Sequence, residues 1–236
     1  MNKPLWVAVV GRKGGSGKTA LALGLAAHYV RERRRVLLVD LDPQGSASLA
    51  LDADASGEHL AEVLEDNAAP EMVTHVTFLD VLTGGPALEN VNATRTLRDA
   101  LDGVEADVVV MDCPPGHADL DRLALHAADV VLAATESHRL GIAGAARVLD
   151  EARTVKPRPR CALVLGRVDE RRGLDRAAPN LLAGAFSVPV MSIHQDSRLA
   201  DALNTGSLPP GSGRAAQDVA AVAAWVDKQS KRKGDA

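Results

Sequence analysis

The stretch Leu5-Trp-Val-Ala-Val-Val-Gly-Arg-Lys-Gly-Gly-Ser-Gly-Lys-Thr19 joins an unbroken apolar run to a glycine-rich loop and the start of an Ala- and Leu-rich segment. An apolar run without alternation is typical of a strand that is covered on both faces of a sheet. The glycines allow the backbone to curl with its N–H groups pointing inward, and the helix that follows adds its positive end at the same place. The stretch therefore predicts a strand, a phosphate-binding loop and a helix, in that order.

The residues of this loop have separate roles in phosphate binding. Lys18 would reach the β- and γ-phosphates of a nucleotide, and the Thr19 hydroxyl would ligate Mg²⁺. The common pattern requires glycine where this chain has Arg12, and Lys13 is an additional lysine of the loop. A glycine-rich turn without a ligand is the alternative, but the strand, loop and helix context favours a nucleotide site. The predicted nucleotide-binding residues are Lys13, Gly14, Gly15, Ser16, Gly17, Lys18, Thr19 and Ala20.

Apolar runs of the same kind recur along the chain and alternate with helix-forming segments. The expected strands are residues 5–11, 36–40, 76–82, 108–112, 130–134, 161–166 and 188–193. The expected helices are residues 19–33, 88–101, 119–127, 142–154, 174–183 and 215–228. This alternation predicts an α/β fold, with a doubly wound, mostly parallel sheet and helices on both faces, in one domain over residues 1–227. Residues 228–236 are polar and basic, which predicts a disordered tail.

Two of the expected strands end in aspartate, at Asp40 and Asp112. Since ligands of such sheets bind at the carboxyl ends of the strands, both carboxylates are expected near the phosphate loop. A carboxylate there can orient the attacking water or hold a metal-bound water, and Asp40 is our candidate; a turn or helix cap is the alternative. Asp112 fits the carboxylate on the Mg²⁺ side, so Thr19, Asp40 and Asp112 form the predicted metal set. Beside it, Cys113 is expected to be a small buried residue rather than a redox thiol.

The composition narrows the function classes. The 236 residues include 2% aromatics and two cysteines and carry a net charge of -4. So few aromatics argue against stacking on single-stranded nucleic acid, and two cysteines cannot build a disulfide framework or a four-ligand zinc site. No apolar run reaches the ~18 residues of a membrane span and no signal peptide precedes the first strand, so we expect a cytoplasmic protein. The charge excludes a uniformly basic nucleic-acid binder and leaves room for a local basic patch.

Together, the loop and the two aspartate segments resemble the deviant Walker-A ATPases, and within them the ParA/Soj partition ATPases. Lys13 matches the signature lysine of that family. Asp40-Leu-Asp-Pro-Gln44 matches the motif whose first aspartate positions hydrolytic water, and Asp112-Cys-Pro-Pro115 matches the Mg²⁺-side carboxylate followed by two prolines. The resemblance covers nearly the whole chain and implies a P-loop NTPase fold with ATP, ADP and Mg²⁺ as ligands. It also implies Lys13, Lys18 and Asp40 as the catalytic residues.

The same resemblance implies a mechanism and partners. Relatives dimerise face to face with two ATP molecules between the subunits, and Lys13 would reach across to the partner's phosphates as an arginine finger does. ATP then makes a homodimer, and slow, partner-stimulated hydrolysis releases it. The implied partners are nonspecific double-stranded DNA and a ParB-like centromere-binding activator. The implied location is the nucleoid.

A basic stretch over residues 153–176 lies in this otherwise acidic protein. With Arg198 it could form a stripe that contacts DNA phosphates without reading sequence; a solvated surface is the alternative. The segment Gln195–Ala202 looks like the part of the ParA-like proteins that carries a basic residue on the DNA-binding face. The predicted DNA-binding residues are Arg167, Arg171, Arg172 and Arg198.

Two departures from the family concern the base of the nucleotide. His194 stands where relatives commonly carry proline, and Gly166-Arg167 stands where they often have Thr or Asn near the adenine.

The last helix has an apolar face of Ala and Val, which favours packing against the sheet over strong membrane binding. Two other function classes stay open: a MinD- or McdA-like ATPase that positions a protein cargo or division component, and a metabolic P-loop enzyme or reductase of the same superfamily.

Overall fold

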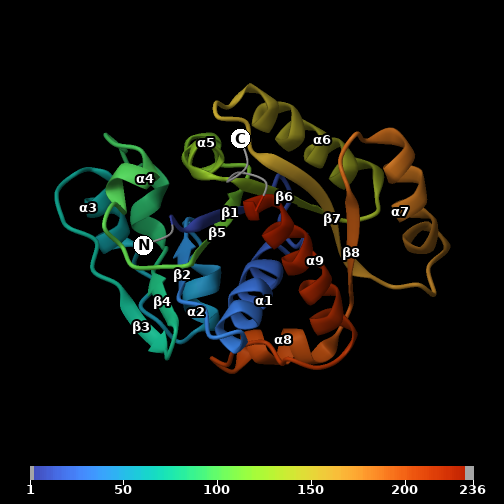
Figure 1. The fold of residues 1–236 in the computed structure, drawn as a ribbon, viewed down its shortest axis with the longest axis horizontal. Coiled ribbons are helices and arrows are strands. Elements are labelled where there is room, and N and C mark those ends of the chain that lie inside the picture. The colour runs from blue at the N-terminus through green and yellow to red at the C-terminus, as the bar shows by residue number, and fades with distance from the viewer. Residues whose placement is uncertain (1–2, 232–236) are drawn as a thin grey trace.

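The chain folds into one twisted sheet with helices on both faces (Figure 1). The structure is a computed structural model, and it describes residues 3–231. The strands are β1 (Leu5–Gly11), β2 (Val36–Asp40), β3 (Val73–Val76), β4 (Leu79–Leu82), β5 (Val108–Pro115), β6 (Val130–Thr135), β7 (Arg160–Val168) and β8 (Val190–His194). The α-helices are α1 (Lys18–Arg31), α2 (Ser46–Ala50), α3 (Glu58–Leu64), α4 (Leu97–Ala100), α5 (Ala118–Ala127), α6 (Arg139–Thr154), α7 (Gly173–Ala185), α8 (Ser197–Asn204) and α9 (Arg214–Lys231), with a 3-10 turn η1 (Pro86–Asn90).

The strand order places β1 in the middle of the sheet. The order is β3-β4-β2-β5-β1-β6-β7-β8, and every neighbouring pair is parallel except β3 and β4. The chain winds to one side of β1 as far as β4 and then to the other side through β6, β7 and β8. This confirms the predicted doubly wound, mostly parallel α/β sheet, and such a reversal puts a ligand-binding crevice at the carboxyl ends of the central strands.

Two apolar cores lie on opposite faces of the sheet. Alternate side chains of the strands pack with α1, α2 and α9 on one face, and the remaining ones pack with α3, α4, α5, α6 and α7 on the other. Figure 1 shows α1 and α9 side by side on the first face. Gly24 allows that contact, because a Cβ there would lie 3.1 Å from the Val219 side chain. The strands are rigidly covered on both sides, which fixes the loops at their ends.

Three sequence-based expectations for the secondary structure were wrong in part. Residues 76–82 are not one strand but the last residue of β3, the turn and β4 of the antiparallel β3–β4 hairpin, in which Phe78 has a φ of 74°. Residues 88–101 are not one helix, because Val91 is extended and a new helix begins only after the Thr96 cap, whose side chain accepts a hydrogen bond from the Asp99 N–H. Helix α9 continues to Lys231, into the segment expected to be a disordered tail, and residues 232–236 lie outside the described part.

The last helix is a core element. Val219, Val222 and Val226 of α9 are buried, 4%, 0% and 0% exposed, against α1 and the sheet. Over residues 3–231, no helix is both long enough and apolar enough to cross a membrane. The apolar face of α9 is therefore used within the fold.

Candidate functional site

The glycine-rich loop lies between the end of β1 and the start of α1, as predicted. Gly17 has a φ of 85° and Gly15 a φ of 77°, conformations that favour glycine. The end of β7 packs directly on this loop, because a Cβ at Gly166 would stand 2.5 Å from the Ser16 carbonyl oxygen. The loop therefore forms a preformed cradle at the N-terminus of α1, where backbone N–H groups and the helix dipole favour an anion.

The two lysines of the loop point to different places. Lys18 is 6% exposed, and its Nζ donates to the Lys13 carbonyl oxygen at 3.3 Å, so it folds back over its own loop. The Lys13 side chain is 52% exposed, and its Nζ donates to Glu136 Oε2 at 2.9 Å and lies 2.8 Å from His138 Nε2. Glu136 and His138 belong to the β6–α6 loop, which carried no recognisable motif. Lys18 thus lies against the glycine-rich loop, whereas Lys13 is held at the surface.

Asp40 is fully buried at the end of β2, and its carboxylate is oriented by three donors. Oδ1 accepts from the Asp42 N–H at 3.1 Å, and Oδ2 accepts from the Ser48 N–H at 2.9 Å and the Ser48 hydroxyl at 2.8 Å. The Ser48 hydroxyl also accepts from the Gly84 N–H at 2.9 Å. Burial raises the pKa of Asp40, and the hydrogen bonds from Ser48 oppose that rise. Ser48 is a functional candidate that the sequence reasoning missed.

Asp112 pairs in register with Asp40 across β5 and β2, so the two strand-end carboxylates are neighbours as predicted. Within the described part of the chain, neither Asp112 oxygen has a well-formed hydrogen bond, although both are buried. Burial and the negative charge of Asp40 raise its pKa, while Thr19 and Lys18 oppose the rise. A buried carboxylate beside a threonine hydroxyl and a phosphate loop fits Mg²⁺, with Thr19 and Asp112 as the residues that would hold it. When bound, the ion would neutralise charge on the phosphates.

Cys113 is fully buried next to Asp112. Burial raises the pKa of its thiol well above the ordinary value. This confirms a small packing residue and leaves no thiolate for redox chemistry.

Arg12, the residue that departs from the common loop pattern, fastens the loop to α5 and α6. Its guanidinium lies 3.0 Å from Asp121 Oδ2 and also pairs with Glu151. Asp121 is 1% exposed, and burial raises its pKa to about 7, although the charge of Arg12 opposes the shift. The loop is therefore braced by an ion pair that titrates near neutral pH.

This raised pKa predicts a pH-dependent stability. A carboxyl group with a higher pKa in the folded state binds more protons there between about pH 4 and pH 7, so its contribution to the free energy of unfolding falls as the pH rises through that window. Asp121→Asn removes the titration. We expect the difference in the free energy of unfolding between the variant and the wild type, measured by urea unfolding, to change by about 2 kcal/mol in favour of the variant between pH 5 and pH 8. Asp119→Asn, which changes an exposed carboxylate of the same helix, is the matched control. If the difference in the free energy of unfolding between Asp121→Asn and the wild type did not change with pH, this would contradict the raised pKa.

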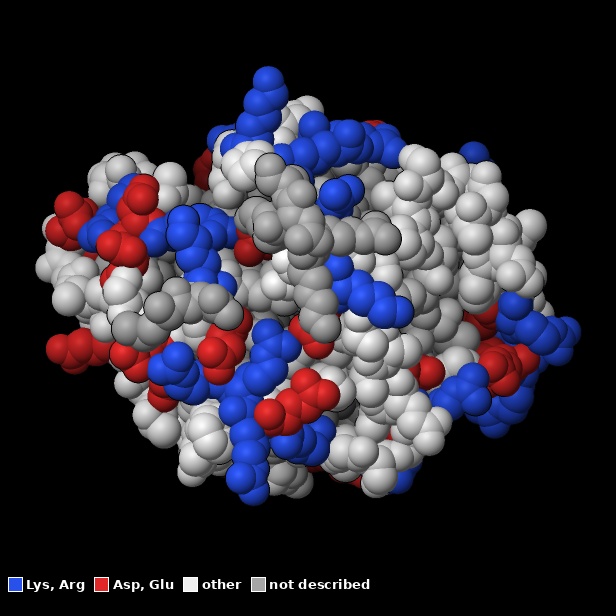
Figure 2. Space-filling view, viewed as in Figure 1, with Lys and Arg blue, Asp and Glu red and all other residues white. Residues whose placement is uncertain are grey.

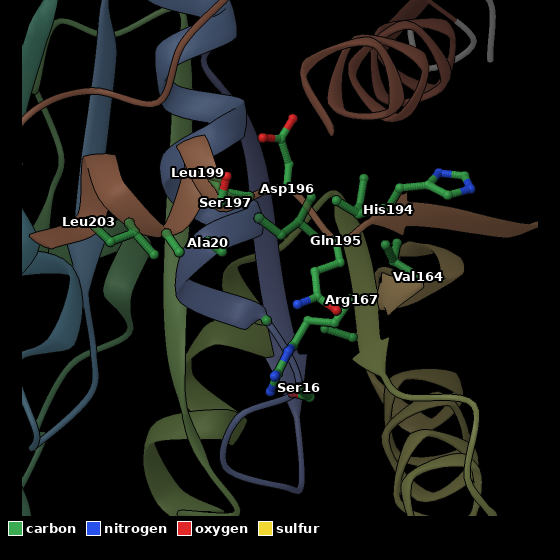
Figure 3. Close-up of a pocket in the computed structure, with 16 residues that line it drawn as sticks. Ser16, Ala20, Val164, Arg167, His194, Gln195, Asp196, Ser197, Leu199 and Leu203 are labelled. Atoms are coloured by element: carbon green, nitrogen blue, oxygen red, sulfur yellow. The ribbon is translucent and has the colours of Figure 1, made fainter. Parts of the chain in front are cut away.

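A pocket of about 300 Å³ opens beside the cradle, between α1, α8 and the ends of β7 and β8 (Figure 3). Ser16 and Gly17 of the loop line one end of it. Arg167, His194 and Gln195 bring polar groups to its wall. Its apolar lining comes from Ala20, Leu21, Ala134, Val164, Ile193, Leu199, Ala200 and Leu203. A nucleotide with its phosphates in the loop would place its base here.

The four arginines predicted to bind DNA lie at the carboxyl ends of β7 and β8, on the same edge as the cradle. Arg167 lines the pocket beside the cradle, 3.8 Å from Glu136 Oε1. Arg171 and Arg172 pair with Asp169 at 2.8 and 4.0 Å, and Arg198 pairs with Asp196 at 2.8 Å. Arg171, Arg172 and Arg198 are thus partly neutralised by carboxylates two or three residues before them in the sequence, a pattern that net charge alone does not reveal. On the face drawn in Figure 2, basic and acidic side chains are likewise interspersed.

Comparison with known proteins agrees with this geometry. A family profile described as an AAA domain matches residues 5–164. The chromosome-partitioning ATPase Soj of Thermus thermophilus is 36% identical over 211 residues, which cover 85% of each chain. Among solved structures, an ATP complex of McdA from Cyanothece superposes with a TM-score of 0.82 at 18% identity, covering 97% of each chain. Cobyrinic acid a,c-diamide synthase from Mycobacterium smegmatis, bound to ADP and magnesium, gives a TM-score of 0.73 at 26% identity, covering 86% of this chain and 93% of that one.

The glycine cradle, the buried Lys18 and the paired strand-end carboxylates define a P-loop nucleotide-binding protein whose site fits ATP or ADP with Mg²⁺. The additional lysine Lys13 and the similarity to Soj over 85% of each chain identify the family within this class. The chain belongs to the ParA/Soj family of partition ATPases.

Proposed function

We propose that this protein is an ATP-driven molecular switch for DNA partition. It hydrolyses ATP to ADP and phosphate slowly, forms a homodimer with ATP between the subunits, and binds double-stranded DNA nonspecifically in that state. A ParB-like centromere-binding partner stimulates hydrolysis and so drives segregation of a plasmid or chromosome over the nucleoid, in the cytoplasm. The coarser part, a positioning ATPase of the ParA family, rests on the family membership.

This proposal rests on the different positions of the two loop lysines, Lys18 buried and Lys13 exposed. Lys18 is buried in the cradle and provides the cation for its own nucleotide. Lys13 is held on the surface by the β6–α6 loop and is available to a second subunit that approaches this edge. A cation that arrives from a partner completes the charge stabilisation of phosphoryl transfer only in the dimer. Dimerisation and hydrolysis are then coupled.

Arg171, Arg172 and Arg198 support a DNA contact through their exposure, although each pairs with a carboxylate. Their side chains are 90%, 71% and 51% exposed, so the guanidinium groups are accessible to phosphate. The hydrogen bonds from Arg171 lower the pKa of Asp169 to about 2, so this pair stays ionised at neutral pH. DNA phosphates must therefore compete with the carboxylates, which favours a weak, salt-sensitive and sequence-independent contact.

Charge reversal of all three residues to Glu should abolish ATP-dependent binding to a nonspecific duplex while nucleotide binding is retained. Because each lost phosphate contact lowers the slope of log K against log salt by about one, partial reversals should lower the slope stepwise. Fluorescence anisotropy with labelled duplex at several salt concentrations measures this. The matched control reverses Arg33, Arg35 and Arg122, which carry the same charge and lie outside the predicted stripe. Duplex binding that survives in the first triple variant, or is lost equally in the control, would remove these arginines from the interface.

Positioning of a protein cargo, as opposed to DNA, is the second candidate. The ion-paired state of the arginines and the close superposition on McdA favour it. Retention of ATP-driven dimerisation together with no duplex binding at low salt would select this function over DNA partition.

A further inference from the structure

Arg12 is the loop residue that directly precedes Lys13, and its side chain leaves the end of β1 toward α5 and α6. Helix α6 packs on the stem of this side chain, because a Cβ at Gly144 would lie 3.1 Å from the Arg12 Cβ and 3.7 Å from its Cγ. Glycine in the interior of a helix is unfavourable relative to alanine. At Gly144 the missing side chain gives Arg12 its room between the loop and α6.

The guanidinium of Arg12 is held by two carboxylates from two different helices. Its Nη1 lies 3.0 Å from Asp121 Oδ2 of α5, and its Nη2 pairs with Glu151 of α6. The Asp121 side chain is 1% exposed, and its Oδ1 has no hydrogen-bond partner among the described residues, so Arg12 compensates its charge. The planar fork of a guanidinium fixes direction as well as distance, which a lysine ammonium in this place would not do.

The next residue, Lys13, is fixed from the Arg12 side of the loop rather than from the glycine side. A Cβ added at Gly14 or Gly15 would meet no described atom within 4 Å apart from its chain neighbours, so there is open space beside these glycines. The Lys13 carbonyl oxygen accepts from Lys18 at 3.3 Å, a side chain that a bound nucleotide would engage. The Lys13 ammonium is bound by the β6–α6 loop, which leads directly into the helix that holds Arg12.

We propose that Arg12 is a positioning residue for Lys13: its two ion pairs let α5 and α6 set the direction in which the Lys13 ammonium leaves the loop toward the second subunit. This inference rests on the proposed function, in which Lys13 acts across the dimer. An error of about 1 Å in the place of a catalytic group can reduce the rate by about 10²-fold. The cradle glycines and Lys18 follow Lys13 in the loop and would bind the nucleotide of their own subunit, so nucleotide affinity should change little without Arg12.

Arg12→Gln is therefore expected to lower kcat for ATP hydrolysis by about 10- to 100-fold, while KM for ATP stays close to the wild-type value. Because hydrolysis in the proposed switch is slow relative to dissociation of ATP, KM reports nucleotide affinity. Glutamine keeps an uncharged donor group, but it supplies no cation for Asp121 and no fork for two carboxylates. The change removes the brace and leaves the loop around Lys13 otherwise intact.

Asp121 makes this brace depend on pH. Burial raises the pKa of Asp121 to about 7, although the charge of Arg12 opposes the rise. The ionisable groups that face it are Arg12 of the loop, Lys18 of α1, Cys113 of β5, His117 before α5 and Glu151 of α6. Protonation of Asp121 turns a charge-assisted hydrogen bond into a weaker neutral one. The charged brace is therefore complete only above about pH 7, and hydrolysis that depends on it should rise through this pH.

A comparison of the wild type with Asp121→Asn isolates this effect, because the variant offers Arg12 a neutral partner at every pH. The ratio of the two kcat values is expected to be close to one at pH 6 and to reach about 5- to 10-fold at pH 8. Titration of other groups, such as Asp40, affects both proteins and cancels in the ratio. Asp119→Asn changes an exposed carboxylate of the same helix and should give a ratio that does not change with pH.

The main experiment measures hydrolysis of Mg-ATP by the full-length protein as a function of ATP concentration, with active sites counted by bound nucleotide. The control is Arg98→Gln, which removes an arginine that pairs with Asp129 at 2.9 Å, at the opposite edge of the sheet, and should keep the wild-type kcat. Arg12→Gln also leaves Asp121 buried without its cation, which destabilises a fold. The double variant Arg12→Gln/Asp121→Asn removes that charge, so it should resist urea better than Arg12→Gln and still hydrolyse ATP slowly.

The outcomes separate this inference from the proposal on which it rests. A wild-type kcat in Arg12→Gln, or recovery of kcat in the double variant, overturns the positioning role. An equal loss of kcat in Arg12→Gln and Arg98→Gln overturns it as well, since both changes then act through stability alone. A ratio of wild type to Asp121→Asn that stays constant from pH 6 to pH 8 overturns the pH-dependent brace. Normal hydrolysis in Lys13→Ala would instead overturn the proposed function, whatever the Arg12 variants do.

Discussion

Asp40→Ala is expected to bind ATP, to accumulate as the ATP-bound dimer and to lose hydrolysis by at least about 100-fold. The Asp40 carboxylate is buried and oriented by Asp42 and Ser48, with two donors on Oδ2 and one on Oδ1. Each carboxylate oxygen can accept two hydrogen bonds, so Oδ1 keeps one position for an attacking water. Removal of the carboxylate removes the orienting group and leaves the cradle and Lys18 in place. Phosphate release under single-turnover conditions, with bound nucleotide quantified in parallel, measures the two effects separately.

Two further variants control this result. Asp80→Ala removes an aspartate from β4 of the same sheet, away from the cradle, and should hydrolyse ATP like the wild type. Asp40→Asn keeps the shape of the side chain, so loss of hydrolysis in this variant separates the missing charge from a missing contact with Ser48. Normal turnover in Asp40→Ala would exclude Asp40 from the chemistry.

Lys13→Ala is expected to keep its affinity for ATP within about tenfold and to lose hydrolysis by about 10³-fold, the contribution of a cation supplied in trans to phosphoryl transfer. Its ammonium is bound to Glu136 and His138 at the surface and does not fold over its own loop, whereas Lys18 does. In the proposed dimer Lys13 must exchange Glu136 for the phosphates of the partner. Hydrogen bonds from Lys13 and His138 lower the pKa of Glu136 despite its partial burial, so the carboxylate competes as an anion.

Lys18→Ala gives the contrast that this prediction needs. It removes the buried cation of the cradle and should abolish nucleotide binding itself, measured with a fluorescent ATP analogue. Equal loss of nucleotide affinity in the Lys13 and Lys18 variants, or full hydrolysis in Lys13→Ala, would contradict the division of labour between the two lysines.

The elements that position the site could be predicted, because the apolar runs, the strand-end residues and the loop glycines all indicate the same local structure. The unbroken apolar runs predicted β1, β2 and β5, and the strand-end rule placed Asp40 beside Asp112, which the register confirms. The loop glycines predicted the cradle, and Gly17 indeed has a positive φ. Roles assigned to individual residues in catalysis, metal binding and DNA binding stay predictions.

Other features left no local signal. The β3–β4 hairpin turns at Phe78, a residue type that rarely marks a positive φ, so the sequence appeared to contain one strand. Glu136 and His138 lie on a loop without a motif, more than a hundred positions from Lys13, and only the sheet brings them to it. Ser48 and Gly84 meet Asp40 for the same reason. Contacts of this kind depend on tertiary placement, which periodicity and spacing do not encode.

The molar mass in solution tests the central claim most directly. Light scattering of the wild type is recorded with no nucleotide, with ADP and Mg²⁺, and with a non-hydrolysable ATP analogue and Mg²⁺. The switch predicts the monomer mass in the first two samples and twice that mass in the third, with Lys18→Ala monomeric throughout. A mass that is the same in all three wild-type samples would contradict it.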